Sequence, residues 1–426
     1  MLPILTVCVF LIAYAFIATE KFNRVAIVCT GAAAMILIGA TNGEAAFYSH
    51  ETGIDWNVIF LLLGMMLLVG VIHQTGLFEY LAVKALQLAK GEPRTAFVYL
   101  LLLVAVASAL LDNVTTIMLA VPMTITAAKL LKVNPLPFIL AEVYISNIGG
   151  AATLIGDPPN IIIGSKAGLD FNEFLIHMAP MVLATLAVII PLLLVMFRKS
   201  LKNTAADRQA LMALEPKSYI KDKALLTKSV VVLSLVLVAF LLHSTLHLEP
   251  AVVAMLGAGL LLLVSKVEPQ EVAKEVEWGT LVFFAGLFVM VGALVNVGAL
   301  KTAADFLGNA VGDNAGLAAG TIVVVSAVVS GIVDNIPYVA SMTPVIQQLN
   351  DTIPGIANDG LWWALAFGAD YGGNMTIVGA SANVVALGLA KANGINISFW
   401  QFAKYGIPVT LVSTLMALPY VLIRYF

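Results

Sequence analysis

The sequence predicts an all-α polytopic membrane protein of two inverted repeats, each with about five transmembrane helices, one re-entrant hairpin and a broken helix at a polar site. Composition, an internal repeat and the placement of charge support this prediction. Of the 426 residues, 61% are hydrophobic and 11% are charged, too few polar groups to cover a soluble protein. Several apolar runs are long enough to cross about 30 Å of hydrocarbon as helices, and they do not alternate as barrel strands would.

The second observation is an internal repeat. Three motifs occur twice, in the same order and 222 or 223 residues apart. The pairs are Asp55-Trp56 with Glu277-Trp278, Asp112-Asn113 with Asp334-Asn335, and residues 149–160 with residues 372–383. Three matches at nearly constant spacing indicate a duplicated transporter half.

Charge placement orients the two copies. We expect an N-terminal repeat at 1–197, a linker at 198–228 and a C-terminal repeat at 229–426. The linker carries eight basic and three acidic residues, so the positive-inside rule places it in the cytoplasm.

Each repeat is expected to contain a hairpin. The hairpin at about 95–131 has lysines at both ends and opens to the cytoplasm, whereas its copy at about 315–349 is bordered by acids and opens outside. The second copy is then inverted, and both termini lie outside. Trp362 and Trp363, like Trp56 and Trp278, are expected at headgroup level.

Asp112 and Asp334 interrupt the apolar hairpins. A carboxylate at bilayer depth costs several kcal/mol unless it is paired, protonated or in a wet cavity, so both are functional candidates. Alternatively, each carboxylate caps the half-helix that follows by accepting backbone N–H bonds. The two roles are compatible.

The broken helices are expected at about 136–165 and about 360–392. Glycine, proline and polar residues inside these apolar spans predict unwound backbone, whose free groups and half-helix ends can hold an ion or a small polar solute. The acid differs between the copies, because Ala380 replaces Asp157 and Asp370 replaces Asn147. Unequal charge is what coupling of a proton or cation to a solute requires.

Glu142 precedes the first break by one to two turns. It is interpreted either as a proton relay or as a residue of the cytoplasmic rim. The proton-coupling candidates are Asp112, Asp157, Asp334, Asp370 and Glu142.

The runs LLDNVTT, AEVYISNIGGAATLIGDPPN, DNIPY and GASANVV together resemble the ion transporter superfamily, in the branch of arsenite permeases, sodium/proton antiporters and the melanosomal P protein. The resemblance implies a scaffold and a transport domain in each half, dimerisation through the scaffold, and a site between hairpin tips and broken helices. With Asp370 added from the unwound stretch, the solute- and ion-binding candidates are Asp112, Asn113, Thr115, Thr116, Asn147, Thr153, Asp157, Asn160, Asp334, Asn335, Asp370, Asn374, Thr376, Ser381 and Asn383.

The expected function is secondary active transport of a small inorganic solute across a prokaryotic-type inner membrane, without enzyme activity, a metal site or a nucleic-acid partner. Proton-coupled efflux of arsenite or antimonite is the leading hypothesis, and a Na+/H+ antiporter is the alternative. A carboxylate or other anion transporter fits less well, because up to four aspartates would lie beside the anion. No cofactor is expected beyond the coupling proton or Na+. The chain has no phosphate-binding loop, so any ATP dependence needs a separate ATPase subunit.

Overall fold

The computed structural model describes residues 1–19, 22–202, 212–312, 314–353 and 359–426. Every regular element in these ranges is a helix, and seven helices are long and apolar enough to cross a membrane, which confirms the predicted all-α polytopic class. The first half holds α1 (Leu2–Thr19), α2 (Arg24–Leu37), α3 (Gly43–Tyr48), α4 (Trp56–His73), α5 (Leu77–Leu88), α6 (Pro93–Leu110), α7 (Asn113–Leu130), α8 (Leu136–Gly150), α9 (Pro158–Ala167), α10 (Phe171–His177) and α11 (Ala179–Met196). The second half holds the 3-10 helices η1 (Pro216–Tyr219) and η2 (Ile377–Gly379) and the α-helices α13 (Lys223–Leu246), α14 (Pro250–Ser265), α15 (Pro269–Ala273), α16 (Trp278–Asn296), α17 (Ala299–Val311), α18 (Ala315–Ser330), α19 (Asn335–Thr352), α20 (Gly360–Gly372), α21 (Ser381–Ala392) and α22 (Phe399–Tyr425).

The helices pack in matching pairs. α4 packs on α14, and the corresponding pair in the repeat is α16 on α2. In the same way, α7 packs on α21, and α19 packs on α9. In each pair, one helix comes from each half of the chain. The halves are therefore interlocked, and the second arm of each hairpin lies against the broken helix of the other half. The inversion of the second copy relative to a membrane stays a prediction.

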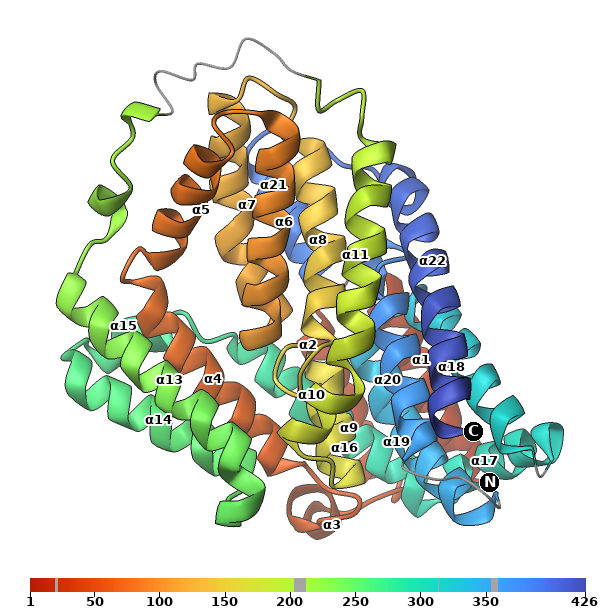
Figure 1. Cartoon of the computed structure of the whole chain (residues 1–426). Helices are drawn as coiled ribbons and strands as arrows, with labels where there is room; N and C mark the ends of the chain where they lie inside the picture. The colour runs from red at the N-terminus through yellow and green to blue at the C-terminus, as the bar shows by residue number, and fades with distance from the viewer. Residues whose placement is uncertain (20–21, 203–211, 313, 354–358) are drawn as a thin grey trace.

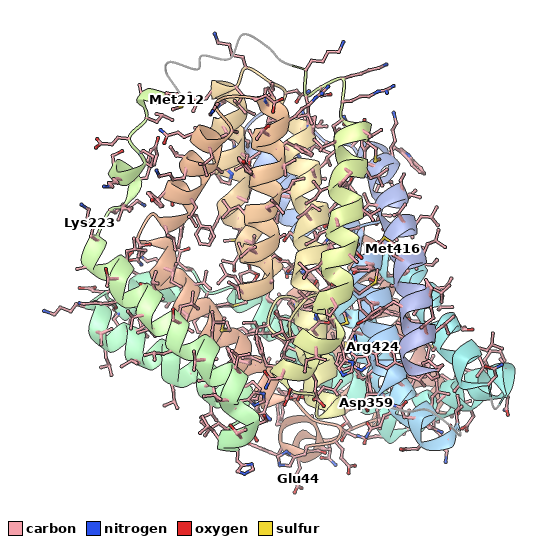
Figure 2. All side chains as sticks on the ribbon, viewed as in Figure 1. Glu44, Met212, Lys223, Asp359, Met416 and Arg424 are labelled. Atoms are coloured by element: carbon pink, nitrogen blue, oxygen red, sulfur yellow. The ribbon has the colours of Figure 1, made fainter. Side chains whose placement is uncertain are left out.

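The two hairpins approach the centre from opposite ends of the molecule. In Figure 1, α6 and α7 run from the end where the linker lies to about the middle, whereas α18 and α19 come from the end that holds both termini. Figure 2 shows long nitrogen-ended side chains at the linker end, with Glu44 and Asp359 at the other end. α13 begins at Lys223, inside the predicted linker, and residues 203–211 of that linker lie outside the described residues.

The turns of both hairpins are short, and an aspartate at the end of each turn caps the helix that forms the second arm. α7 begins directly after Asp112, and α19 begins directly after Asp334. Each carboxylate accepts a backbone N–H bond from the first turn of its helix, which satisfies a donor that has no partner within the helix.

The breaks follow from proline and glycine. α9 begins at Pro158, whose missing N–H and fixed φ suit the first turn of a helix and weaken a helix interior. A Cβ on Gly149 would lie 2.6 Å from the backbone oxygen of Ala105, and a Cβ on Gly372 would lie 2.6 Å from that of Ala327. In both halves, glycine therefore allows the first hairpin arm to lie directly against the broken helix.

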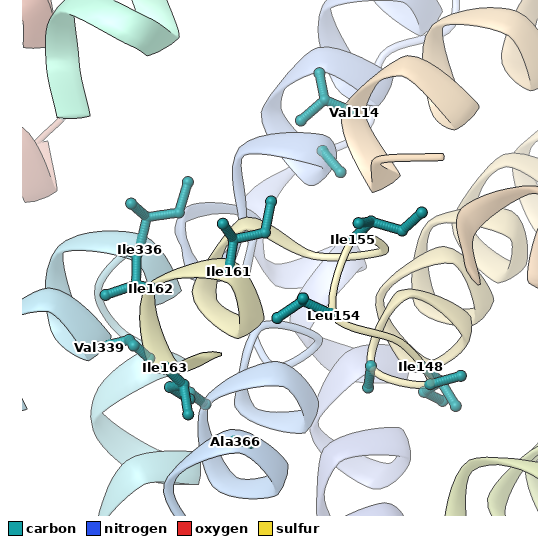
Figure 3. Close-up of a cluster of buried hydrophobic side chains, with 14 of the residues drawn as sticks. Val114, Ile148, Leu154, Ile155, Ile161, Ile162, Ile163, Ile336, Val339 and Ala366 are labelled. Atoms are coloured by element: carbon teal, nitrogen blue, oxygen red, sulfur yellow. The ribbon is translucent and has the colours of Figure 1, made fainter. Parts of the chain in front are cut away.

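Apolar side chains enclose the first break. Figure 3 shows Leu154, Ile155 and Ile161 of this region among side chains from α7, α8, α19 and α20. These isoleucines and Leu154 are buried. The polar groups at the break therefore lie in a dry, low-dielectric surrounding, where electrostatic interactions are strong.

The tryptophan prediction is half wrong. Trp56 and Trp278 are 45% and 53% exposed, and their place at headgroup level stays a prediction. Trp362 and Trp363 are buried instead of facing lipid, because every residue of α20 is buried and Trp363 stacks on His177.

Candidate functional site

The Asp112 carboxylate at the first hairpin tip is fully used by its own helix. Oδ1 accepts a bond from the backbone N–H of Thr115 at 2.8 Å, and Oδ2 accepts one from the Thr115 hydroxyl at 2.5 Å. The alternative that Asp112 caps α7 is thus realised in the structure. Its predicted role in proton coupling stays a prediction.

Asp334 at the second tip has partners from elsewhere in the chain. Oδ1 accepts the backbone N–H of Ile336 at 3.0 Å, and Oδ2 accepts the hydroxyl of Ser381 at 2.7 Å. Arg24 lies 3.7 Å from the same Oδ2. The two tips are alike in sequence but differ in what holds them.

Amide side chains from both halves meet at the centre. Asn113 Nδ2 lies 3.0 Å from Asp157 Oδ2 and 3.3 Å from Asn147 Oδ1. Asn147 Nδ2 in turn lies 3.0 Å from the side-chain oxygens of Asn374 and Asn383. The first hairpin and the two breaks are therefore joined by one continuous set of hydrogen bonds.

The breaks face each other in a crossed arrangement. Asn147 of the first break bonds Asn383 of the second, and Asp370 of the second lies beside Asn160 of the first. These pairs are equivalent in the repeat, because 147 and 370, like 160 and 383, differ by 223. Asn335 of the second hairpin lies beside Asp157.

Several buried polar atoms at this crossing have no hydrogen-bond partner among the described residues. They are Asp157 Oδ1, both carboxyl oxygens of Asp370, Asn160 Oδ1, Asn335 Nδ2 and Asn374 Nδ2. Asp157 and Asp370 are 1% and 0% exposed, and their carboxyl groups interact electrostatically. An unsatisfied buried group costs about 1–3 kcal/mol, and more when it is charged. The arrangement can therefore bind a proton, a cation or the hydroxyl groups of a solute.

The predicted threonines of the breaks have backbone partners. The hydroxyl of Thr153 donates to the carbonyl of Ala109 at 2.5 Å, and that of Thr376 donates to the carbonyl of Gly331 at 2.7 Å. Ala109 and Gly331 are equivalent residues at the ends of the first hairpin arms. These threonines join each hairpin to the broken helix of its own half.

Glu142 forms a second polar spot, apart from the crossing. Its carboxyl group accepts the hydroxyl of Thr124 and lines a small cavity with Thr116, among α5, α6, α7 and α8. Glu142 is 1% exposed, and one of its oxygens has no partner among the described residues. Its relay role stays a prediction.

Sequence reasoning missed Arg24. Its guanidinium contacts Ser381 and Thr280 and lies near Asp334. Its sequence signal is a basic residue next to a long apolar run, and no repeated motif contains it. Within the described residues, no group of three or more His, Cys, Asp or Glu side chains could hold a metal ion.

Comparison with known proteins places the chain in a family. The family described as CitMHS, citrate transporter, matches residues 14–368. The chain is 48% identical over 427 residues to an uncharacterized transporter of Mycobacterium tuberculosis, covering 100% of this chain and 99% of that protein. It is 35% identical over 491 residues to the human P protein, covering 97% of this chain but 59% of the P protein.

Two solved structures share the fold. The YdaH transporter of Alcanivorax borkumensis aligns with a TM-score of 0.59 at 15% identity, over 99% of this chain and 98% of that chain. MtrF of Neisseria gonorrhoeae, whose structure is said to illuminate a class of antimetabolite efflux pumps, aligns with a TM-score of 0.63 at 10% identity, over 100% and 95% of the two chains. These matches confirm the predicted resemblance, and the chain belongs to the CitMHS citrate transporter family of multi-pass membrane transporters.

Proposed function

We propose that this protein is a proton-coupled secondary active transporter of a prokaryotic-type inner membrane, and that Asp157 and Asp370 take up the coupling proton. The observation that carries the proposal is the buried pair itself, with three carboxyl oxygens lacking a protein partner. Two like charges in a low-dielectric site are costly together, so a proton, a cation or a donor group of the solute must offset them. Exchange of these occupants is the chemistry of a coupled transporter.

The solute we propose is arsenite or antimonite in its neutral hydroxide form, exported as protons enter. Its hydroxyl groups are donors that suit the unpaired oxygens of Asp157, Asp370 and Asn160. The solute carries no negative charge, so it is not repelled by the carboxylates. The two cysteines, Cys8 and Cys29, lie on the exposed faces of α1 and α2 and are not part of this chemistry.

A Na+/H+ antiporter is the second candidate. Hard cations prefer oxygen ligands, and the crossing offers unpaired oxygens of carboxyl and amide type. Citrate, named in the description of the family, is the third. Citrate would need its negative charge offset, and the guanidinium of Arg24, beside Ser381 and 3.7 Å from Asp334, would be the group to supply a positive charge.

The test is transport by purified protein in proteoliposomes under an imposed pH gradient. Arsenite, antimonite, Na+ and citrate are compared in one preparation, with the gradient abolished by an ionophore as control. We expect arsenite and antimonite to accumulate against their gradient only while protons run the other way. If Na+ alone dissipates the pH gradient, the antiporter replaces the proposal, and accumulation of citrate alone would favour the substrate in the family's description.

A further inference from the structure

The guanidinium of Arg24 connects four helices. Nη1 donates to the Ser381 hydroxyl at the start of α21 at 2.6 Å, and Nη2 lies 3.3 Å from the Thr280 hydroxyl of α16. Nη1 is also 3.7 Å from Asp334 Oδ2, directly before α19. Arg24 itself begins α2, so α2, α16, α19 and α21 all meet at one side chain.

These helices belong to two different parts of the molecule. α2 and α16 pack on each other and carry none of the predicted site residues. α19 and α21 begin at the second hairpin tip and at the second break, next to the crossing. Thr280 also donates to Glu277, the N-cap residue of α16, at 2.9 Å. The chain of contacts therefore runs from the start of α16, through Arg24, to the site.

Among the described residues, the equivalent place in the first half has no such link to its hairpin tip. Asp55 is the counterpart of Glu277, and it pairs with Lys166 at 3.7 Å, beyond the first break at the far end of α9. Asp112, the counterpart of Asp334, is held by Thr115 of its own helix. Among the described residues, the second hairpin tip, at Asp334, is therefore held by the charged Arg24 of another helix, whereas the first tip, at Asp112, is held by its own helix.

We infer that Arg24 is a positioning residue of the transport site, which holds the second hairpin tip and the start of α21 against α2 and α16. Bonds to charged groups are stronger than neutral ones, and the planar guanidinium can hold Ser381 and Thr280 at the same time. Fixing the start of α21 fixes Asn383, two residues beyond Ser381, and with it the bond to Asn147. Arg24 thereby preorganises the site without contacting the solute.

The inference rests on the proposed function only in the first of two measurements, which is transport. We compare Arg24→Gln and Arg24→Lys with the control Lys166→Gln. The control breaks the ion pair with Asp55, whose N–O distance of 3.7 Å equals that between Arg24 and Asp334 but which lies away from the second hairpin tip. Arg24→Gln should raise KM about tenfold, as expected for loss of a charge-assisted hydrogen bond, with Vmax changed less than about twofold. Arg24→Lys keeps the charge and should restore part of the affinity, and Lys166→Gln should keep the KM of the wild type.

A second measurement does not need a known solute. Hydrogen exchange of residues 331–338 and 376–383 in detergent should be about tenfold faster in Arg24→Gln and unchanged in Lys166→Gln, because only the first variant removes the charged tether. Unchanged exchange in Arg24→Gln, or equal acceleration in both variants, would overturn the inference. Loss of transport with unchanged exchange would instead make Arg24 a ligand of the solute. If the wild type moves none of the tested solutes, the proposed function fails, and exchange alone decides the role of Arg24.

Discussion

At the residue scale, the two breaks differ mainly in where the acid lies. Asp157 and Asp370 come from opposite halves and from non-equivalent positions, and the crossing of the breaks brings them together. Had both copies kept the residues of either half, the site would hold two acids at equivalent positions. The unequal copies instead place acids beside amides, which is a surrounding suited to binding and releasing a proton.

The structure makes Asp112 a helix cap, and this leads to a prediction. Asp112→Ala should lower the free energy of unfolding by about 1 kcal/mol, the usual cost of losing an N-cap. Asp112→Asn keeps an acceptor oxygen and should retain most of that stability, and we expect its pH profile of transport to match the wild type. Thermal unfolding in detergent and transport at several pH values check both variants. A shifted pH profile in Asp112→Asn would instead support the coupling role predicted for this carboxyl group.

Part of the site could be predicted from sequence, and part could not. Asp-Asn in an apolar run and proline after a polar stretch are local signals, so Asp112, Asp157 and Asp334 could be found as candidates. The bond between Asn147 and Asn383, and the position of Arg24, depend on contacts between segments more than 200 residues apart. No local pattern encodes such contacts.

At the scale of elements, helices occupy the ranges in which the sequence predicts the first hairpin and the first broken helix, and the re-entrant character of the hairpin in a membrane stays a prediction. The first hairpin was expected at about 95–131, and α6 and α7 run from Pro93 to Leu130. The first broken helix was expected at about 136–165, and α8 and α9 run from Leu136 to Ala167. Proline and N-cap residues set these bounds locally, which is why sequence sufficed. The burial of Trp362 and Trp363 was missed because it depends on what packs around α20.

The close approach of each hairpin to its broken helix should be sensitive to a single methyl group. Gly149→Ala places a Cβ 2.6 Å from a backbone oxygen, which cannot move aside as a flexible side chain could. We expect a loss of about 1–3 kcal/mol of unfolding free energy, as for other overpacked cores.

Gly388→Ala is the matched control for this variant. It lies in α21, and a Cβ there would meet nothing within 4 Å. Alanine is the better helix former, so this variant should be as stable as the wild type or more so. Both are compared by thermal unfolding in the same detergent. Equal stability of the two variants would contradict the packing described here.

At the scale of the whole molecule, the linker and the α3 end lie at opposite ends (Figure 1), and the positive-inside rule predicts that the linker end faces the cytoplasm. Exposed Ser218 of η1 and exposed Glu44 of α3 report on the two ends. In a variant with Cys8 and Cys29 replaced by serine, we expect Ser218→Cys to react with an impermeant maleimide only in inside-out vesicles.

Glu44→Cys should react only in right-side-out vesicles, because it lies at the other end of the molecule (Figure 2). Labelling after detergent solubilisation is the control that both cysteines are reactive. The reverse pattern would invert the topology, and labelling of both positions from one side would contradict the arrangement of the two ends.

The central claim is that Asp157 and Asp370 exchange a proton for the solute. The most direct test is the proton movement driven by an outward arsenite gradient in proteoliposomes that hold a pH-sensitive dye. Wild-type protein and the surface control Asp351→Asn should move protons against the arsenite flow, because exposed Asp351 lies at the end of α19, away from the crossing. Asp157→Asn and Asp370→Asn keep the size of the side chain but cannot bind the proton, so each should fall to the rate of empty vesicles. Proton movement at the wild-type rate in either variant would contradict the claim.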